Sequence, residues 1–136
     1  MRRILILTAA LLAACAGDTL VPDRVPAEAA VSFSNAPGDT SITTAGDSVV
    51  ARTSLPYGCS GDVTARATRE GGTLVVTLTD SLQYPVPCAY LAQYRNYRAA
   101  AGPLRGGRYP VELRFREVVA SVVTESTLLR ATVVIP

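Results

Sequence analysis

The chain has 136 residues with 13 basic and 11 acidic side chains, which allows one small domain and a short appendage. Arg2 and Arg3 precede a hydrophobic run, and the other eleven basic residues balance the eleven acids. This balance argues against nucleic-acid binding, which needs a strong positive field. The chain contains neither histidine nor lysine, so it lacks the commonest general base and the commonest transition-metal ligand. We therefore predict no catalytic residue, no metal and no cofactor.

The first 14 residues have the pattern of an export signal. Met1-Arg2-Arg3 precedes an apolar run, Ile4 to Ala14, which is too short to cross about 30 Å of hydrocarbon. Leu12-Ala13-Ala14-Cys15 resembles the lipobox of bacterial lipoproteins. The resemblance implies cleavage before Cys15 and a lipid, with palmitate among its acyl chains, that anchors this residue in a membrane. A plain secretory signal with an incidental cysteine is the alternative.

The residue after the cysteine bears on which membrane holds the anchor. Ala16 stands where an aspartate would resemble an inner-membrane retention signal. We therefore expect the outer membrane, with the protein facing the periplasm.

Residues 15–30 form the next region. Pro22, Pro26 and several charged residues stand among few large apolar groups, a composition that cannot bury enough surface to fold alone. We predict a lipidated cysteine followed by an extended tether over 15–30, and a folded domain over 31–136.

Beyond Val31 the dominant period of the sequence is two. Apolar and polar residues alternate in the runs 49–55, 63–68, 74–79, 109–116 and 129–135, as in strands that have one face in a core. Glu70-Gly71-Gly72 joins two such runs and predicts a hairpin, because glycine accepts a positive φ. The pattern predicts an all-β, antiparallel two-sheet sandwich of about seven strands.

The segment Leu104 to Leu113 resembles the Leu-x-x-Gly-x-Tyr-x-Val-x-Val signature of immunoglobulin-like and fibronectin-III-like sandwiches. The resemblance implies a tyrosine corner, in which the Tyr109 hydroxyl bonds to upstream backbone. We predict an acceptor within residues 102–107 and Leu104 in the core beside the ring. Pro110 departs from the signature and lacks a backbone donor, which predicts an unpaired start to this strand.

Two cysteines remain once Cys15 is assigned to the lipid. In an oxidising compartment, the pair Cys59 and Cys88 predicts a disulfide. A redox or metal-binding pair is the alternative, and the absence of Cys-x-x-Cys and of histidine disfavours it.

Five of the six tyrosines and four arginines lie within residues 84–109. Tyrosine and arginine are enriched at binding hot spots, and arginine pairs with carboxylates and phosphates. A candidate binding face therefore comprises Tyr90, Tyr94, Arg95, Tyr97 and Arg98. In a regular strand Tyr90 and Tyr94 share one face and Tyr97 lies on the other. The alternative is that these are ordinary strand residues with solvated arginines.

These features together predict a non-catalytic envelope module that binds a protein or glycan partner. One alternative is a structural or accessory lipoprotein of a larger envelope assembly, which a bare edge strand favours. Another is a carboxylate-dependent hydrolase that uses Glu112 with Glu117, or Asp62 with Asp80. Glu112 is expected on the polar face of its strand, where a carboxylate is solvated.

Overall fold

The computed structural model describes residues 24–56, 61–82 and 94–136. Within these ranges the chain forms nine strands and no helix, and therefore no helix that could cross a membrane. The strands are β1 (Arg24–Val25), β2 (Ala27–Ser34), β3 (Ser41–Ala45), β4 (Ser48–Pro56), β5 (Asp62–Glu70), β6 (Thr73–Leu82), β7 (Tyr94–Ala101), β8 (Gly107–Val119) and β9 (Val122–Ile135). The predictions for Cys15, Cys59, Cys88 and Tyr90 lie outside the described residues.

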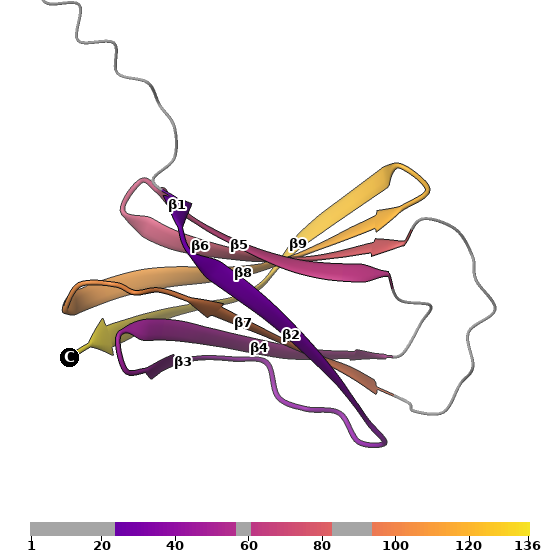
Figure 1. Ribbon diagram of the computed structural model, residues 1–136, viewed down its shortest axis with the longest axis horizontal. Coiled ribbons are helices and arrows are strands. Elements are labelled where there is room, and N and C mark those ends of the chain that lie inside the picture. Colours follow the sequence, from indigo (N-terminus) through magenta and orange to yellow (C-terminus); the bar gives the residue numbers. More distant parts are fainter. Residues whose placement is uncertain (1–23, 57–60, 83–93) are drawn as a thin grey trace, which may run out of the picture.

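The strands form two sheets that stack face to face (Figure 1). Sheet A has the order β1-β5-β6-β8-β9, and sheet B has the order β2-β7-β4-β3. The core lies between them and is filled by inward-facing residues such as Val49, Leu74, Leu78, Val111 and Leu113. The predicted all-β two-sheet sandwich is confirmed, with nine strands in the described ranges where about seven were expected.

One pairing departs from the antiparallel expectation. β6 and β8 pair in parallel, from Leu74 opposite Val111 to Leu82 opposite Val119. Parallel neighbours need a crossover connection. Here the crossover passes through β7, which comes between β6 and β8 in the sequence but belongs to sheet B. The sandwich is therefore mainly, but not wholly, antiparallel.

The predicted tether over 15–30 is wrong at its C-terminal end, because residues 24–30 contain β1 and the first half of β2. Val25, Ala27, Ala29 and Val31 pack against the core from alternate positions. Pro26 marks the point at which the chain passes from sheet A, where β1 pairs with β5, to sheet B, where β2 pairs with β7. Small alternating residues bury little surface each, so composition alone made this stretch look unstructured.

The hydrogen bond predicted for Tyr109 links the start of β8 to the segment before it. The Tyr109 hydroxyl donates to the carbonyl oxygen of Arg105 at 2.7 Å, and Leu104 is buried in the core. Pro110 lies opposite Thr132 of β9, so the expectation of an unpaired strand start is wrong on that side. On the other side the pairing with β6 begins only at Val111, one residue after Pro110.

Two hairpins of sheet A turn through residues with positive φ. Gly71 and Gly72 (φ 54° and 84°) connect β5 to β6, as the sequence predicts. Ala120 and Ser121 (φ 46° and 72°) connect β8 to β9 without a glycine. This second hairpin extends away from the rest of the sandwich, at the end opposite the start of β1 (Figure 1).

Candidate functional site

Strand β7 carries most of the predicted binding face and divides it between two environments. Arg95 and Tyr97 point into the sandwich and are each 5 % exposed. Arg98 points outward and is exposed, and Tyr94 is half-buried. The four described candidates therefore do not form one face, because side chains alternate along a strand.

The inward pair belongs to a buried polar network that joins the two sheets. Arg95 of sheet B forms an ion pair with Asp80 of β6 at 2.8 Å, and it donates a second bond to the Gly61 carbonyl at 3.3 Å. The Tyr97 hydroxyl donates to the same carboxylate at 2.7 Å, and the Gly61 amide donates to its other oxygen at 3.1 Å. The network therefore links the two sheets, and removal of one charged partner would leave the other charge buried and uncompensated.

Aromatic rings pack around this network, in which the Arg95 and Asp80 side chains are each 7 % exposed. The Arg95 guanidinium lies 5.1 Å from the centre of the Tyr97 ring and 5.8 Å from that of Phe33. The Tyr97 ring packs edge-on against Phe115, with 5.0 Å between the ring centres. Burial raises the pKa of Tyr97 above its ordinary value, and the hydrogen bond to Asp80 raises it further. Tyr97 therefore stays a neutral donor, which suits a structural role.

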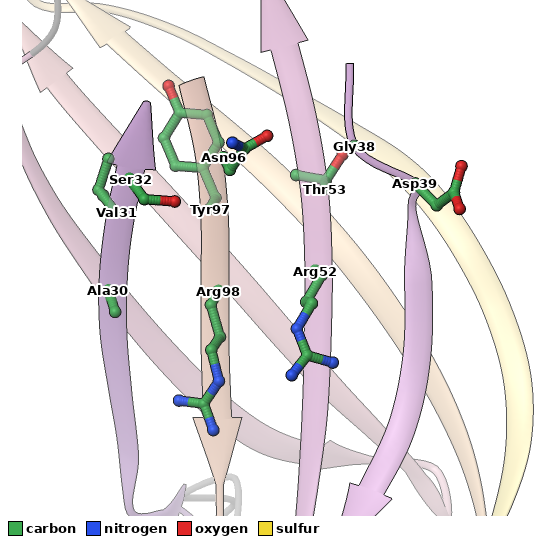
Figure 2. A pocket seen from close by; sticks show the side chains of 10 residues that line it. All are labelled: Ala30, Val31, Ser32, Gly38, Asp39, Arg52, Thr53, Asn96, Tyr97 and Arg98. Atoms are coloured by element: carbon green, nitrogen blue, oxygen red, sulfur yellow. The ribbon is translucent and has the colours of Figure 1, made fainter. Parts of the chain in front are cut away.

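The outward side of β7 lines a hollow of about 280 Å³ on the outer face of sheet B (Figure 2). Small residues create the space, since Ala30 lies directly opposite Arg98, and Ser32 directly opposite Asn96. The chain at Gly38 passes so close that an added Cβ would lie 3.2 Å from Asn96 Oδ1. The hollow is lined by Ala30, Val31, Ser32, Gly38, Asp39, Arg52, Thr53, Asn96, Tyr97 and Arg98.

Two arginines occupy this hollow on neighbouring strands. Arg52 of β4 is directly opposite Arg98 of β7, and it is the one such arginine pair in the registers of the described strands. Figure 2 shows both side chains running in the same direction along the sheet, while the Asp39 carboxylate points away from them. Neither has a salt bridge or hydrogen bond to any residue that the structure describes. We call these two residues the arginine pair.

Sequence reasoning found only one member of the arginine pair. The alternation over 49–55 places Arg52 outward, as observed, but nothing in the sequence indicates that β4 lies beside β7. A pattern of period two gives the face of a residue and not its neighbour on the next strand.

The outer face of sheet A carries charges of a different kind, and one prediction fails there. Glu112 was expected to be solvated, but it is only 8 % exposed. It accepts hydrogen bonds from Arg114 at 2.6 Å, Arg130 at 2.9 Å and Thr127 at 2.9 Å. The bonds from Arg114, Arg130 and Thr127, in that order, lower the pKa of Glu112 to about 2.

Neither pair of acids that the hydrolase alternative requires is formed. Asp80 faces the interior, whereas Asp62 is exposed and opposite Ser81 rather than Asp80. Glu112 and Glu117 are five positions apart on β8, an odd offset, so they lie on opposite faces of the sheet. No group of three acidic or sulfur ligands that could hold a metal occurs in the described part of the chain.

Comparison of the chain with known protein families, with curated proteins and with solved structures gives no match. The fold and the side-chain geometry are therefore the observations from which a function is argued.

Proposed function

We propose that this protein is a non-catalytic binding module that faces the periplasm. A lipid on Cys15 anchors it to the outer membrane. The lipobox-like residues Leu12 to Cys15 support the anchor. β1 begins at one end of the long axis of the sandwich (Figure 1). A chain that enters there leaves the long outer faces of both sheets accessible to a partner in the envelope.

The observation that carries the binding function is the arginine pair. Like charges directly opposite each other on neighbouring strands destabilise a sheet. Other arginines of the described strands either lie against a carboxylate, as Arg95 does, or have no arginine opposite them, as is true of Arg66 and Arg116. The arginine pair forms no ion pair with a described carboxylate, and the Asp39 carboxylate in the same hollow points away from it, so a negatively charged group of a partner fits there.

The second candidate function is an accessory role in a larger envelope assembly. It is favoured by the tip of the β8–β9 hairpin, where Val119, Val122 and Val123 are 41 %, 67 % and 50 % exposed. β9 is also an edge strand of sheet A in the described structure, and an uncovered edge is a template for pairing with another chain.

The anchor is tested by labelling with palmitate in cells. Wild-type protein should incorporate the label and Cys15→Ala should not. Equal absence of label from both proteins, with both released from the membrane fraction, would show that the lipid anchor is wrong.

The two candidate functions are separated by chemical crosslinking of the full-length lipidated protein in intact envelopes. If the proposed function is correct, Arg52→Gln combined with Arg98→Gln abolishes the crosslinked species. A matched control, Arg66→Gln with Arg116→Gln, removes two arginines from sheet A and should leave that species unchanged. Loss of the species in Val122→Ser with Val123→Ser, and not in the arginine variant, would favour the assembly role instead.

A further inference from the structure

The arginine pair brings two positive charges together in the hollow on sheet B. Its two guanidinium groups come from adjacent strands and run in the same direction (Figure 2). Ala30 lies beside Arg98 and Ser41 beside Arg52, so the residues that flank the pair in register are small. A planar anion held between two guanidinium groups can accept a bidentate hydrogen bond from either of them.

The site cannot satisfy these donors from its own strands. The acid nearest in register is Glu28, opposite Ala100 and two residue pairs along from Arg98, and it forms no ion pair with either arginine. Asp39 lines the hollow, but its carboxylate is directed away from the arginine pair (Figure 2). No carboxylate of the described strands forms an ion pair with either arginine, so both guanidinium groups have donors available for a ligand.

The size and lining of the hollow favour a sugar ligand over a protein partner. Its volume of about 280 Å³ is just below the usual range of about 300–1,000 Å³ for small-ligand sites, which suits a single ring. At a protein interface, arginine hot spots usually lie among large aromatic or apolar side chains that are buried at the centre of the contact. The exposed large apolar residues of the described chain are Phe33, Val119, Val122, Val123 and Val134, and none of them lines the hollow. Short polar groups, including Ser32 and Asn96, line it instead.

We propose that Arg52 and Arg98 together bind the carboxylate of an acidic sugar in an envelope glycan. This inference rests on the proposed binding function and names the chemical class of its ligand. The two guanidinium groups hold the carboxylate, and the short polar side chains around them leave room for the hydroxyl groups of the ring. No covalent step is involved.

The test is titration calorimetry of the full-length lipidated protein in detergent. The probes are trigalacturonate, the corresponding neutral galactose trimer, triglutamate and inorganic phosphate. Trigalacturonate should bind, and it should bind more tightly than each of the other three. Arg52→Gln or Arg98→Gln should weaken this binding about tenfold or more, because each removes a charge-assisted hydrogen bond.

The controls separate geometry from net charge. Arg66→Gln and Arg116→Gln make the same change of charge on sheet A and should leave affinity unchanged. Arg98→Lys keeps the charge but loses the planar fork, so affinity should be partly lost. Urea unfolding should show that every variant keeps the fold.

Three outcomes would overturn the inference. If triglutamate binds as tightly as trigalacturonate, the site binds acidic peptides. If the neutral trimer binds as tightly, the arginines do not recognise the carboxylate charge. Binding of no probe would also refute it. If the crosslinked species in intact envelopes is nevertheless lost in the double arginine variant, the proposed binding function stands and only the acidic sugar is wrong.

Discussion

Arg95 and Arg98 lie three residues apart on β7, and their surroundings are opposite. Arg95 is enclosed between the sheets, where Asp80 neutralises its charge and two aromatic rings cover it. Arg98 is exposed beside another arginine. The difference shows that residue type in this strand does not indicate role. A buried charge with its partners in place serves the fold, whereas an exposed charge without them is available to a ligand.

The outer face of sheet A gives the same comparison between two surfaces. Arg114 and Arg130 lie on that face, and both bond to Glu112. On the outer face of sheet B the arginine pair has no comparable acid. We therefore expect substitutions of the paired charges on sheet A to change stability, and substitutions of the arginine pair to change binding.

The largest expected effect comes from breaking the buried network. Arg95→Ala leaves the Asp80 carboxylate buried without its cation and should lower the free energy of unfolding by about 3–5 kcal/mol. Arg98→Ala, on the outward side of the same strand, should change it by less than about 0.5 kcal/mol. Urea denaturation measures both. Similar losses from the two variants would contradict the assignment of structural and binding roles on β7.

The predicted Cys59–Cys88 disulfide lies outside the described residues and concerns the same part of the chain. Cys59 precedes Gly61 by two residues, and Cys88 lies between Asp80 and Arg95 in the sequence, so the bond would link segments next to those that the network joins. Cys59→Ser with Cys88→Ser should cost about 2–4 kcal/mol. Peptide mapping without reductant should recover one crosslinked pair, and recovery of two alkylated thiols from periplasmic material would show that the bond does not form.

Acid should weaken the paired face of sheet A in a defined pH range. Folding lowers the pKa of Glu112 from 4.5 to about 2, so its contribution to stability is complete above pH 4.5 and is lost as the pH falls toward 2. The difference in urea midpoint between wild type and Glu112→Gln should be large at neutral pH and shrink across this range. A difference that is independent of pH would mean that the carboxylate charge contributes nothing.

The smallest effects distinguish two tyrosine hydroxyls. Tyr97 donates to a buried carboxylate, so Tyr97→Phe should cost about 1.5–3 kcal/mol. Tyr109 donates to a backbone carbonyl at an exposed site, so Tyr109→Phe should cost about 0.5–1.5 kcal/mol while the fold is kept. Thermal or urea unfolding ranks the two variants, and the reverse order would contradict the burial assigned to Tyr97.

The sequence predicted the local features of the sandwich well. The alternation over 109–116 placed Val111 and Leu113 in the core, and Gly71-Gly72 marked the β5–β6 turn. These features depend on neighbours in the chain, so a sequence pattern contains them. The strands at 24–34 were missed because their inward residues are mostly alanine and valine interrupted by Pro26.

The buried network and the burial of Glu112 could not be predicted in this way. Asp80 was considered only as a partner for Asp62, yet its partners Arg95 and Tyr97 come from the opposite sheet. Glu112 is covered by donors from its own strand and from β9, among them Arg130, which is eighteen residues away. Contacts between distant segments depend on which strands the fold brings together.

The sequence by itself determined that this chain is a β-rich domain and which face of each strand most of its side chains occupy, because the side-chain period of two is a property of the extended backbone. Only the tertiary structure decided that β4 lies beside β7 and that Arg52 stands opposite Arg98. Strand order and register depend on the packing of the whole core, to which every strand contributes at once. The candidate binding site is therefore a consequence of strand pairing, although both of its arginines are printed in the sequence.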